Sequence, residues 1–217
     1  QKDLGVCVVN IGASTTSLVV YEEGDILHTA VMPIGSDHIT SDLAIGLRTS
    51  IDVAEQVKLR YATCLSEDIS KKDEINLAEL GAPEDEFVGR KFVADITEAR
   101  VLEIFEHVDR ELQKADRSGM LPAGVILTGG GSKLSGMLET AKQILRLPIS
   151  LGTPIGVSSV IDRMSDPSMS TAIGLVLWGR HIRSADSGKG FGKVIQKLGS
   201  LDKVGSGLMK MFRSMKP

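Results

Sequence analysis

Residues 6–21 read VCVVNIGASTTSLVVY, two apolar segments that flank a turn of small and hydroxylated residues. The pattern predicts two neighbouring strands, 6–9 and 18–21. Gly12 permits a tight turn, so that backbone amides and hydroxyls of the turn can face an anion. An ordinary hairpin with polar turn residues explains the same letters equally well. The candidate phosphate-binding residues are Asn10, Gly12, Ala13, Ser14, Thr15 and Thr16.

The composition allows one domain or two small ones, because 42% of the 217 residues are hydrophobic and 24% are charged. No run reaches the roughly 20 apolar residues that cross a bilayer, and we do not expect the residues before the first strand to be a signal peptide. The chain starts with Gln1, so we expect a piece of a longer protein. Cys7 and Cys64 are far apart in the sequence and predict buried, reduced thiols.

Strands and helices alternate along the chain. A third strand is predicted at 26–33, followed by a helix capped by Ser36 or Asp37 and a second helix capped by Thr49. Short strands are expected in 73–80 and 85–96, and a helix in 98–117. Further strands are predicted at 125–127 and 147–154. Asp166 and Pro167 are expected to open an apolar, buried helix that ends near residue 179.

This order predicts an α/β protein with one subdomain inserted into another. Residues 1–34 and 118–179 form the predicted core subdomain, and residues 35–117 form a small α+β insert. Residues 180–204 are interpreted as a basic flexible linker and 205–217 as an amphipathic helix. From Arg180 onward the chain has nine Lys and Arg against two Asp and Glu, whereas the preceding part is acidic. A basic tail on an acidic body indicates an anionic partner for the tail.

Two further features bear on a ligand site. Gly129, Gly130 and Gly131 follow the strand at 125–127 and let a flat ligand approach the backbone. Glu55 and Lys58 are three residues apart on one helix face, a spacing that a surface ion pair also explains. Neither feature is specific alone.

Taken together, these features resemble the second half of the actin and Hsp70 superfamily of ATPases, and most closely the bacterial cell-division family FtsA. The specific stretches are DHITSDLAIGLRTS and VILTGGGSKLSGM, and the resemblance extends from Gly5 to Met215. It implies an actin-like, ribonuclease H-like fold. It also implies ATP as the ligand, with the turn at 10–16 on the phosphates, Glu55 and Lys58 on the ribose and adenine, and Gly129, Gly130 and Gly131 beside the nucleoside.

Asn10 departs from the family pattern, which has Asp at this position. A neutral amide is a poorer partner for Mg²⁺ and for the attacking water, so hydrolysis is not expected. The first phosphate loop of the family belongs to a half that is absent from this sequence. We therefore expect an incomplete site with weak ATP binding, with no catalytic residue and no metal ligand assigned.

The end of the chain, GLMKMFRSMKP, has apolar and basic residues on different sides of a predicted helix. This pattern is typical of a helix that lies on an anionic membrane surface, and a terminal helix docked on its own domain is the alternative. Nucleic-acid binding is not favoured, because no base-reading motif is present. The predicted membrane-binding residues are Leu208, Lys210, Met211, Phe212, Arg213 and Met215.

In FtsA-like proteins the smaller subdomain binds the C-terminal peptide of the tubulin-like protein FtsZ. By resemblance, Arg90, Arg100 and Glu103 contact this peptide, and arginine suits it because its planar fork donates two parallel hydrogen bonds to a carboxylate. Solvated helix ends explain the same charges without a partner.

The leading hypothesis is an actin-like cell-division scaffold that tethers FtsZ filaments to the inner face of the cytoplasmic membrane at the division site and that polymerises when full length. Two alternatives stay open at this point. One is a pilus-assembly scaffold of similar fold, which is expected to lack the amphipathic tail. The other is a sugar-kinase-type enzyme, which needs the carboxylate that Asn10 replaces.

Overall fold

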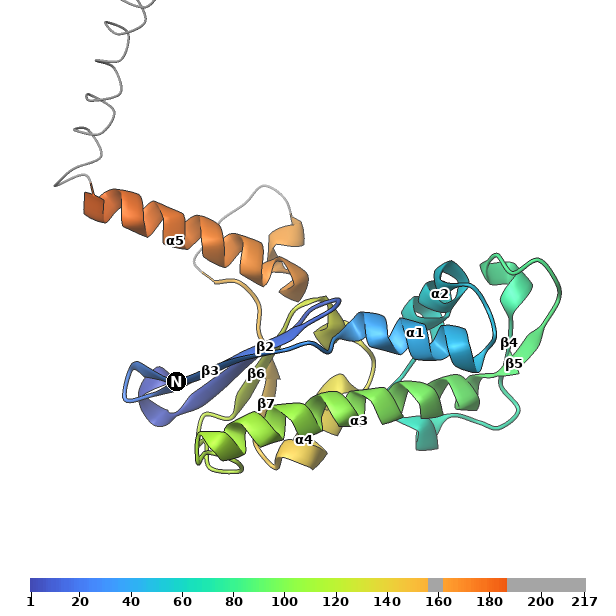
Figure 1. Ribbon diagram of the computed structural model, residues 1–217, viewed down its shortest axis with the longest axis horizontal. Coiled ribbons are helices and arrows are strands. Elements are labelled where there is room, and N and C mark those ends of the chain that lie inside the picture. Colours follow the sequence, from blue (N-terminus) through green and yellow to red (C-terminus); the bar gives the residue numbers. More distant parts are fainter. Residues whose placement is uncertain (156–161, 187–217) are drawn as a thin grey trace, which may run out of the picture. The chain divides into compact units, whose positions relative to one another are not determined.

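The computed structural model describes residues 1–155 and 162–186 (Figure 1). The chain divides into two compact units, Gln1–Thr171 and Ala172–Pro217, and each is considered by itself. In its described residues, the first unit contains a five-stranded sheet, a two-stranded sheet, four complete α-helices and the first two residues of a fifth. The predicted linker beyond Asp186 and all six predicted membrane-binding residues lie outside the described residues.

The five-stranded sheet has the order β3-β2-β1-β6-β7. β1 (Val6–Ile11), β2 (Thr16–Glu22) and β3 (Asp25–Met32) form an antiparallel meander. β6 (Val125–Thr128) and β7 (Ile149–Leu151) add in parallel. The three predicted opening strands and the strand after residue 124 are thus confirmed. Parallel addition of β6 to β1 places the ends of both strands, and the loops that follow them, at the same edge of the sheet.

One face of this sheet forms the centre of the hydrophobic core. Alternate residues of β1 and β2 point to it, because successive side chains of a strand lie on opposite faces. Cys7 is buried there as a free thiol, and Cys64 is also free and buried, as predicted. Burial raises the pKa of both thiols to about 12, so neither is reactive at neutral pH.

Two short helices follow the meander. α1 (Ser36–Gly46) begins after Gly35, whose amide donates to His38 Nδ1 at 3.1 Å. α2 (Ile51–Tyr61) begins after Ser50, whose hydroxyl accepts from the amide of Val53 at 3.3 Å. The predicted cap at Ser36 or Asp37 is wrong by one or two residues, and the predicted cap at Thr49 is wrong by one. Where two polar residues that can cap a helix are adjacent, such as Thr49 and Ser50, the sequence does not show which one is the cap, because the backbone geometry decides it.

α3 (Arg90–Lys114) is much longer than predicted. The segment 90–96 was expected to be a strand, but Val93, Ala94 and Thr97 are buried at helical spacing and continue into Val101. Their burial beside α1 and α2 favours the helix over the local strand pattern. Because its later turns bury Phe105, Val108 and Leu112 in the core shared with the sheet, one rigid helix joins the predicted core and insert.

The remaining elements are short. β4 (Glu74–Asn76) and β5 (Phe87–Gly89) form the small antiparallel sheet, and the 3₁₀ helix η3 (Leu77–Leu80) lies between them in sequence. Another 3₁₀ helix, η2 (Ser66–Asp68), precedes them. The chain also contains η1 (Lys2–Leu4), η4 (Gly130–Lys133), α4 (Met137–Leu145), η5 (Asp162–Ser165) and η6 (Pro167–Met169).

The last described helix is α5 (Ser170–Asp186). Asp166 caps the preceding turn as predicted, since its carboxylate accepts from the amide of Ser168 at 2.9 Å. The prediction that this helix is buried all round is wrong, because Leu175, Val176 and Trp178 are exposed. Hydropathy shows that a helix can be buried, but burial depends on a second surface. Among the described helices none is long and apolar enough to cross a membrane.

Phe105 tests the idea that α3 is held by the shared core. Its side chain is fully buried, so we expect Phe105→Ala to lower the free energy of unfolding by about 3–5 kcal/mol through lost burial and a residual cavity. Urea denaturation followed by circular dichroism measures this change. Leu102→Ala, on the partly exposed side of the same helix, is the control and should cost about 1 kcal/mol or less. Equal losses in the two variants would contradict the proposed packing.

Candidate functional site

A cavity of about 760 Å³ lies in the first unit, at the edge of the sheet where β1 and β6 end. The loop after β1, the beginning of α1, the exposed end of α2 and the glycine loop after β6 all contribute to its wall. The lining residues are Ala13, Ser36, Asp37, Ile39, Glu55, Lys58, Leu59, Arg60, Ala62, Arg90, Gly130, Gly131, Lys133, Leu134 and Ser135. Four cationic side chains against two carboxylates make its wall suitable for an anion.

The loop after β1 is held against the beginning of α1 by backbone bonds. The amide and the hydroxyl of Ser36 both donate to the carbonyl of Gly12, at 3.0 and 3.1 Å. The amide of Asp37 donates to the carbonyl of Ala13 at 2.8 Å, and Ser14 Oγ donates to the Asp37 carboxylate at 3.3 Å. Ala13, Ser14 and Thr15 remain exposed. The carbonyls of the loop are therefore turned toward α1, which leaves its outer side for a ligand.

Two predicted members of this loop have other roles. Thr16 is fully buried, and its hydroxyl donates to the carbonyl of Ile34 at 2.8 Å, so it is not available to a ligand. Asn10 Nδ2 donates to Thr171 Oγ1 at 3.3 Å. The prediction that the Thr16 hydroxyl faces an anion is thus wrong, because a β-strand begins at this residue and turns its side chain into the core.

The glycines after β6 are explained mainly by contact between the two loops. A Cβ on Gly129 would lie 2.4 Å from the Asn10 side-chain oxygen, and its φ is +88°. A Cβ on Gly131 would lie 2.5 Å from the Ile11 side chain. Gly130 is different, since its nearest neighbour is Ser168 Cβ at 3.9 Å. Gly129 and Gly131 allow close packing on β1, and Gly130 leaves open space in the wall of the cavity.

Glu55 and Lys58 form a structured pair rather than a solvated one. Lys58 is 7% exposed, lies 2.6 Å from the Glu55 carboxylate and donates to Thr40 Oγ1 at 2.8 Å. The Thr40 hydroxyl donates to Glu55 at 2.6 Å. Burial by itself raises the pKa of Glu55, but the bonds from Lys58 and Thr40 outweigh it and hold the pKa below its ordinary value. Glu55 therefore stays ionised, and its bonds with Lys58 and Thr40 fix α2 to α1.

A second ion pair involves Lys133, which also lines this cavity. Lys133 donates to the Asp166 carboxylate at 2.6 Å. This bond, together with those from Ser168, lowers the pKa of Asp166 to about 2. Lys133 thus has an anionic partner in place and supplies less free positive charge to the cavity than its position alone indicates.

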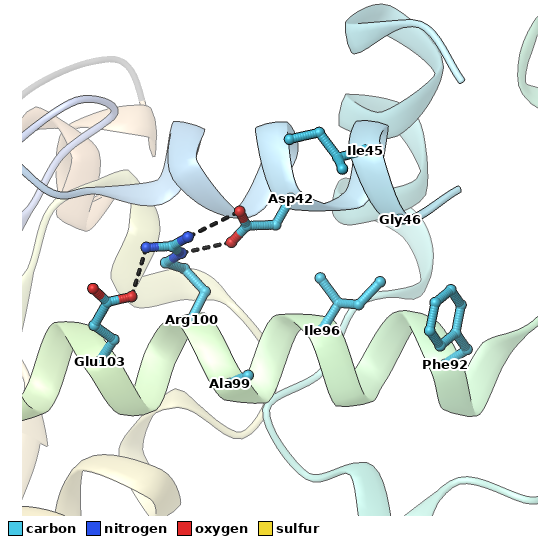
Figure 2. Close-up of a pocket in the computed structure, with 8 residues that line it drawn as sticks. All are labelled: Asp42, Ile45, Gly46, Phe92, Ile96, Ala99, Arg100 and Glu103. Carbon is cyan, nitrogen blue, oxygen red and sulfur yellow. Dashed lines mark hydrogen bonds and ion pairs between the residues drawn. The ribbon is translucent and has the colours of Figure 1, made fainter. Parts of the chain in front are cut away.

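A smaller pocket of about 380 Å³ lies between α1 and α3 (Figure 2). Its apolar part comes from Ile45, Phe92 and Ile96, and its polar part is a cluster of three charges. Arg100 donates to both Asp42 oxygens, Nε at 2.5 Å and Nη2 at 2.9 Å, and its Nη1 donates to Glu103 at 2.6 Å. The bonds to Asp42, followed by its charge and that of Glu103, raise the pKa of the Arg100 guanidinium.

The structure separates the three residues that were predicted to bind one partner. Arg100 and Glu103 line the smaller pocket, whereas Arg90 lines the larger cavity and donates to the Tyr61 carbonyl at 3.5 Å. Residues ten positions apart on a helix are about 15 Å apart along its axis. Arg90 therefore lies at the larger cavity and not with Arg100.

Comparison with known proteins identifies the family of this chain. The family described as Cell division protein FtsA matches residues 7–174, most of the chain. The chain belongs to the FtsA family. It is 38% identical over 179 residues to FtsA of Pseudomonas aeruginosa, covering 82% of this chain and 43% of that protein. It is 42% identical over 179 residues to FtsA of Neisseria meningitidis, covering 81% of this chain and 43% of that protein. This FtsA-family chain spans about half the length of the curated relatives it matches.

Solved structures show that the fold is actin-like. One neighbour is MreB5 of Spiroplasma citri bound to ADP, with a TM-score of 0.66 and 17% identity over 86% of this chain and 56% of that one. Another is the PilM-PilN type IV pilus biogenesis complex, with a TM-score of 0.61 and 22% identity over 82% of this chain and 46% of that one. The predicted fold class and family are confirmed, and of the three classes kept open the family match selects cell division.

Sequence reasoning missed several residues of both sites. Lys133 is two residues after Gly131, so its proximity to the glycine loop was a signal. Thr40 could also have been found, because it lies one helical turn after Ser36 and therefore on the same side of α1. Asp42 had none, since its partner Arg100 is 58 positions away.

The Glu55–Lys58 pair predicts a pH dependence. A carboxyl whose pKa is lowered by folding contributes stability above its unfolded pKa, about 4.3, and this contribution is lost as the pH falls through the folded pKa. We expect Lys58→Met to remove it, since burial then raises the pKa of Glu55. The difference in free energy of unfolding between wild type and variant should shrink as the pH falls from 6 to 3.

Urea titrations at several pH values measure this difference. Arg110→Met is the control, because Arg110 is 3.8 Å from Glu106 and both side chains are more than half exposed, so their pair is largely solvated. A difference for Lys58→Met that is the same at pH 6 and pH 3 would contradict the assigned role.

Proposed function

We propose that this chain is the partner-binding and membrane-binding half of an actin-like cell-division scaffold, which tethers FtsZ filaments to the cytoplasmic face of the membrane at the division site. The observation that carries the proposal is the pocket between α1 and α3 in a chain of the FtsA family. Ile45 is 77% exposed and Phe92 is 49% exposed, although both line a concave surface. Exposed apolar side chains beside a hollow indicate a docking site.

A short peptide fits a surface of this size and shape. The pocket offers room for about one large side chain, and the helices on either side supply polar groups at its rim. The FtsZ C-terminal peptide is the proposed occupant, by family membership. Arg100 and Glu103 belong to this site, and Arg90 is no longer included because of its place in the larger cavity.

The larger cavity is the proposed nucleotide site. ATP fits it by the chemistry of its wall, since the exposed turn at 13–15 offers amides and hydroxyls to phosphates and Gly130 leaves a flat surface for the nucleoside. The apolar side chain of Leu59 and the Glu55–Lys58 pair line the same cavity. Mg²⁺ is the proposed counter-ion of the phosphates, and Asp37 is the carboxylate beside the loop. The FtsA relatives are about twice as long, so this half is proposed to bind nucleotide weakly and not to hydrolyse it.

The tail is the proposed membrane anchor, on the sequence pattern alone. Phe212 and its apolar neighbours share one side of the predicted helix, and Lys210 and Arg213 can face anionic headgroups. One short helix binds reversibly, so self-association of the full-length protein is proposed to add avidity.

A single recruitment experiment tests the tether. Vesicles of phosphatidylglycerol and phosphatidylethanolamine are floated with a labelled FtsZ C-terminal peptide, with or without the chain. We expect the peptide to float only when the chain is present. Phe212→Glu should abolish flotation of both chain and peptide, because a charge enters the apolar side of the anchor. Ile45→Asp should leave the chain on the vesicles and reduce peptide recruitment at least tenfold.

Ile51→Asp is the matched control for Ile45→Asp, since Ile51 is 56% exposed and lines neither cavity. It should recruit the peptide like wild type. If Ile45→Asp recruits the peptide as well as wild type does, the pocket is not the peptide site. If the wild-type chain does not float with the vesicles, the proposed membrane anchor is wrong.

Nucleotide binding has its own test. Gly130→Val places a side chain in the open space of the cavity with little effect on the fold, because its nearest neighbour is 3.9 Å away. We expect at least tenfold weaker binding of a fluorescent ATP analogue, measured by anisotropy in the presence of Mg²⁺. Gly89→Ala, where nothing lies within 4 Å of the new Cβ, is the control. Equal affinity of Gly130→Val and wild type would place the nucleotide elsewhere.

A further inference from the structure

The positive charges in the wall of the larger cavity are not all balanced. Two of the four cationic side chains are held by carboxylates: Lys58 lies 2.6 Å from Glu55, and Lys133 is paired in the same way. The other two are Arg60 and Arg90. Within the described part of the chain, neither arginine forms an ion pair. Their two charges are therefore available to a ligand in the cavity.

The two arginines lie at one end of the cavity. Arg60 belongs to the last turn of α2, and Arg90 Nε donates to the carbonyl of Tyr61, the last residue of that helix, at 3.5 Å. Ser135 lines the cavity as well, and its carbonyl accepts from the amide of Cys64 at 2.8 Å. The end of α2, the beginning of α3 and the segment after the glycine loop thus form this part of the wall.

This end is separated from the loop after β1. Asp42 of α1 pairs with Arg100 of α3. A Cβ on Gly46, one turn later on α1, would lie 2.5 Å from Ile96, one turn earlier on α3, so the two helices are antiparallel (Figure 2). The first residues of α1 and α3 therefore lie on opposite sides of this ion pair, on the order of 20 Å apart along α3. Both line the cavity, which thus extends from the loop to the arginines.

The two ends of the cavity also differ in charge. Asp37 is the carboxylate beside the loop, where it accepts from Ser14 Oγ at 3.3 Å. It has no ion-pair partner among the residues that the structure describes. Phosphates held at the loop therefore need a counter-ion such as the proposed Mg²⁺. The guanidinium groups at the other end need none, because they donate charge-assisted hydrogen bonds to an anion directly.

We propose that Arg60 and Arg90 form a second anion site, which binds a phosphate-type oxyanion separately from the nucleotide. The planar fork of a guanidinium matches two oxygens of such an ion, and the Ser135 hydroxyl in the same part of the wall is a further donor. The distance from the loop lets both ligands bind at once. The inference rests on the proposed nucleotide site only for this last statement.

Inorganic phosphate is the probe. ¹H–¹⁵N NMR spectra of the chain at pH 7.5 are recorded during a titration with phosphate, at an ionic strength held constant with NaCl because salt screens exposed charges. We expect the amide signals of Arg60 and Arg90 to shift and to saturate at millimolar phosphate. Arg60→Gln and Arg90→Gln should each weaken binding roughly fivefold, read at the signal of the other position, because each removes charge-assisted bonds.

Arg110→Gln is the matched control, because Arg110 is more than half exposed and does not line the cavity. It should bind phosphate like wild type. A second titration measures binding of the fluorescent ATP analogue by anisotropy, with and without saturating phosphate at equal ionic strength. Its affinity should change by less than about twofold, since salt screens charges over about 8 Å and the two ligands are farther apart. Thermal melting checks that each variant is folded.

The outcomes separate the anion site from the proposed nucleotide site. If no signal saturates, or if saturation is unchanged in both arginine variants, the anion site is wrong and the nucleotide site is unaffected. If phosphate displaces the ATP analogue, the two ligands share one site and the separate anion site is wrong. If the analogue does not bind at all, the proposed nucleotide site fails, and the phosphate titration still decides whether the arginines bind an anion.

Discussion

The close approach of Gly35 to the loop after β1 is the constraint on which both sites depend. A Cβ on Gly35 would lie 2.4 Å from the Ala13 carbonyl oxygen, so no other residue fits without moving the backbone. This contact lets Ser36 and Asp37 bond the loop carbonyls and starts α1 at the edge of the sheet. α1 then runs from the larger cavity to the smaller pocket. Both are formed on one 11-residue helix, whose position is set at its first turn.

Two ion pairs, Glu55–Lys58 on α2 and Asp42–Arg100 between α1 and α3, show how buried and partly buried charges fix helices in place. Lys58 is almost completely buried, yet its charge is balanced by Glu55 and its donors by Thr40 and Ser36. Arg100 joins α3 to α1 in the same way through Asp42. Removing one partner of such a pair leaves an uncompensated charge, which costs more than the pair itself contributes. These residues therefore have a positional role whatever ligand occupies the cavities beside them.

Family membership and geometry support different parts of the proposed function. The FtsA match identifies the class of protein, and the actin-like neighbours identify the fold. Neither comparison says which surface binds a partner. The proposed partner-binding surface is instead argued from the exposed apolar side chains that lie beside the charged cluster between α1 and α3. The same geometry moves Arg90 from the partner site to the larger cavity, where it adds to the positive charge of the wall.

The sequence by itself determined the meander of β1 to β3, the glycine loop after β6, the pairing of Glu55 with Lys58 and the family. Local periodicity and short-range spacing encode all of these. Only the tertiary structure decided that α3 begins at Arg90, because burial of Val93 and Thr97 against α1 and α2 outweighs a local strand pattern. It also decided that Thr16 faces the core and that Arg100 is held by Asp42, 58 residues away. Contacts between residues so far apart in the chain leave no local pattern, so the ion-pair cluster between α1 and α3 was not readable before the helices were placed.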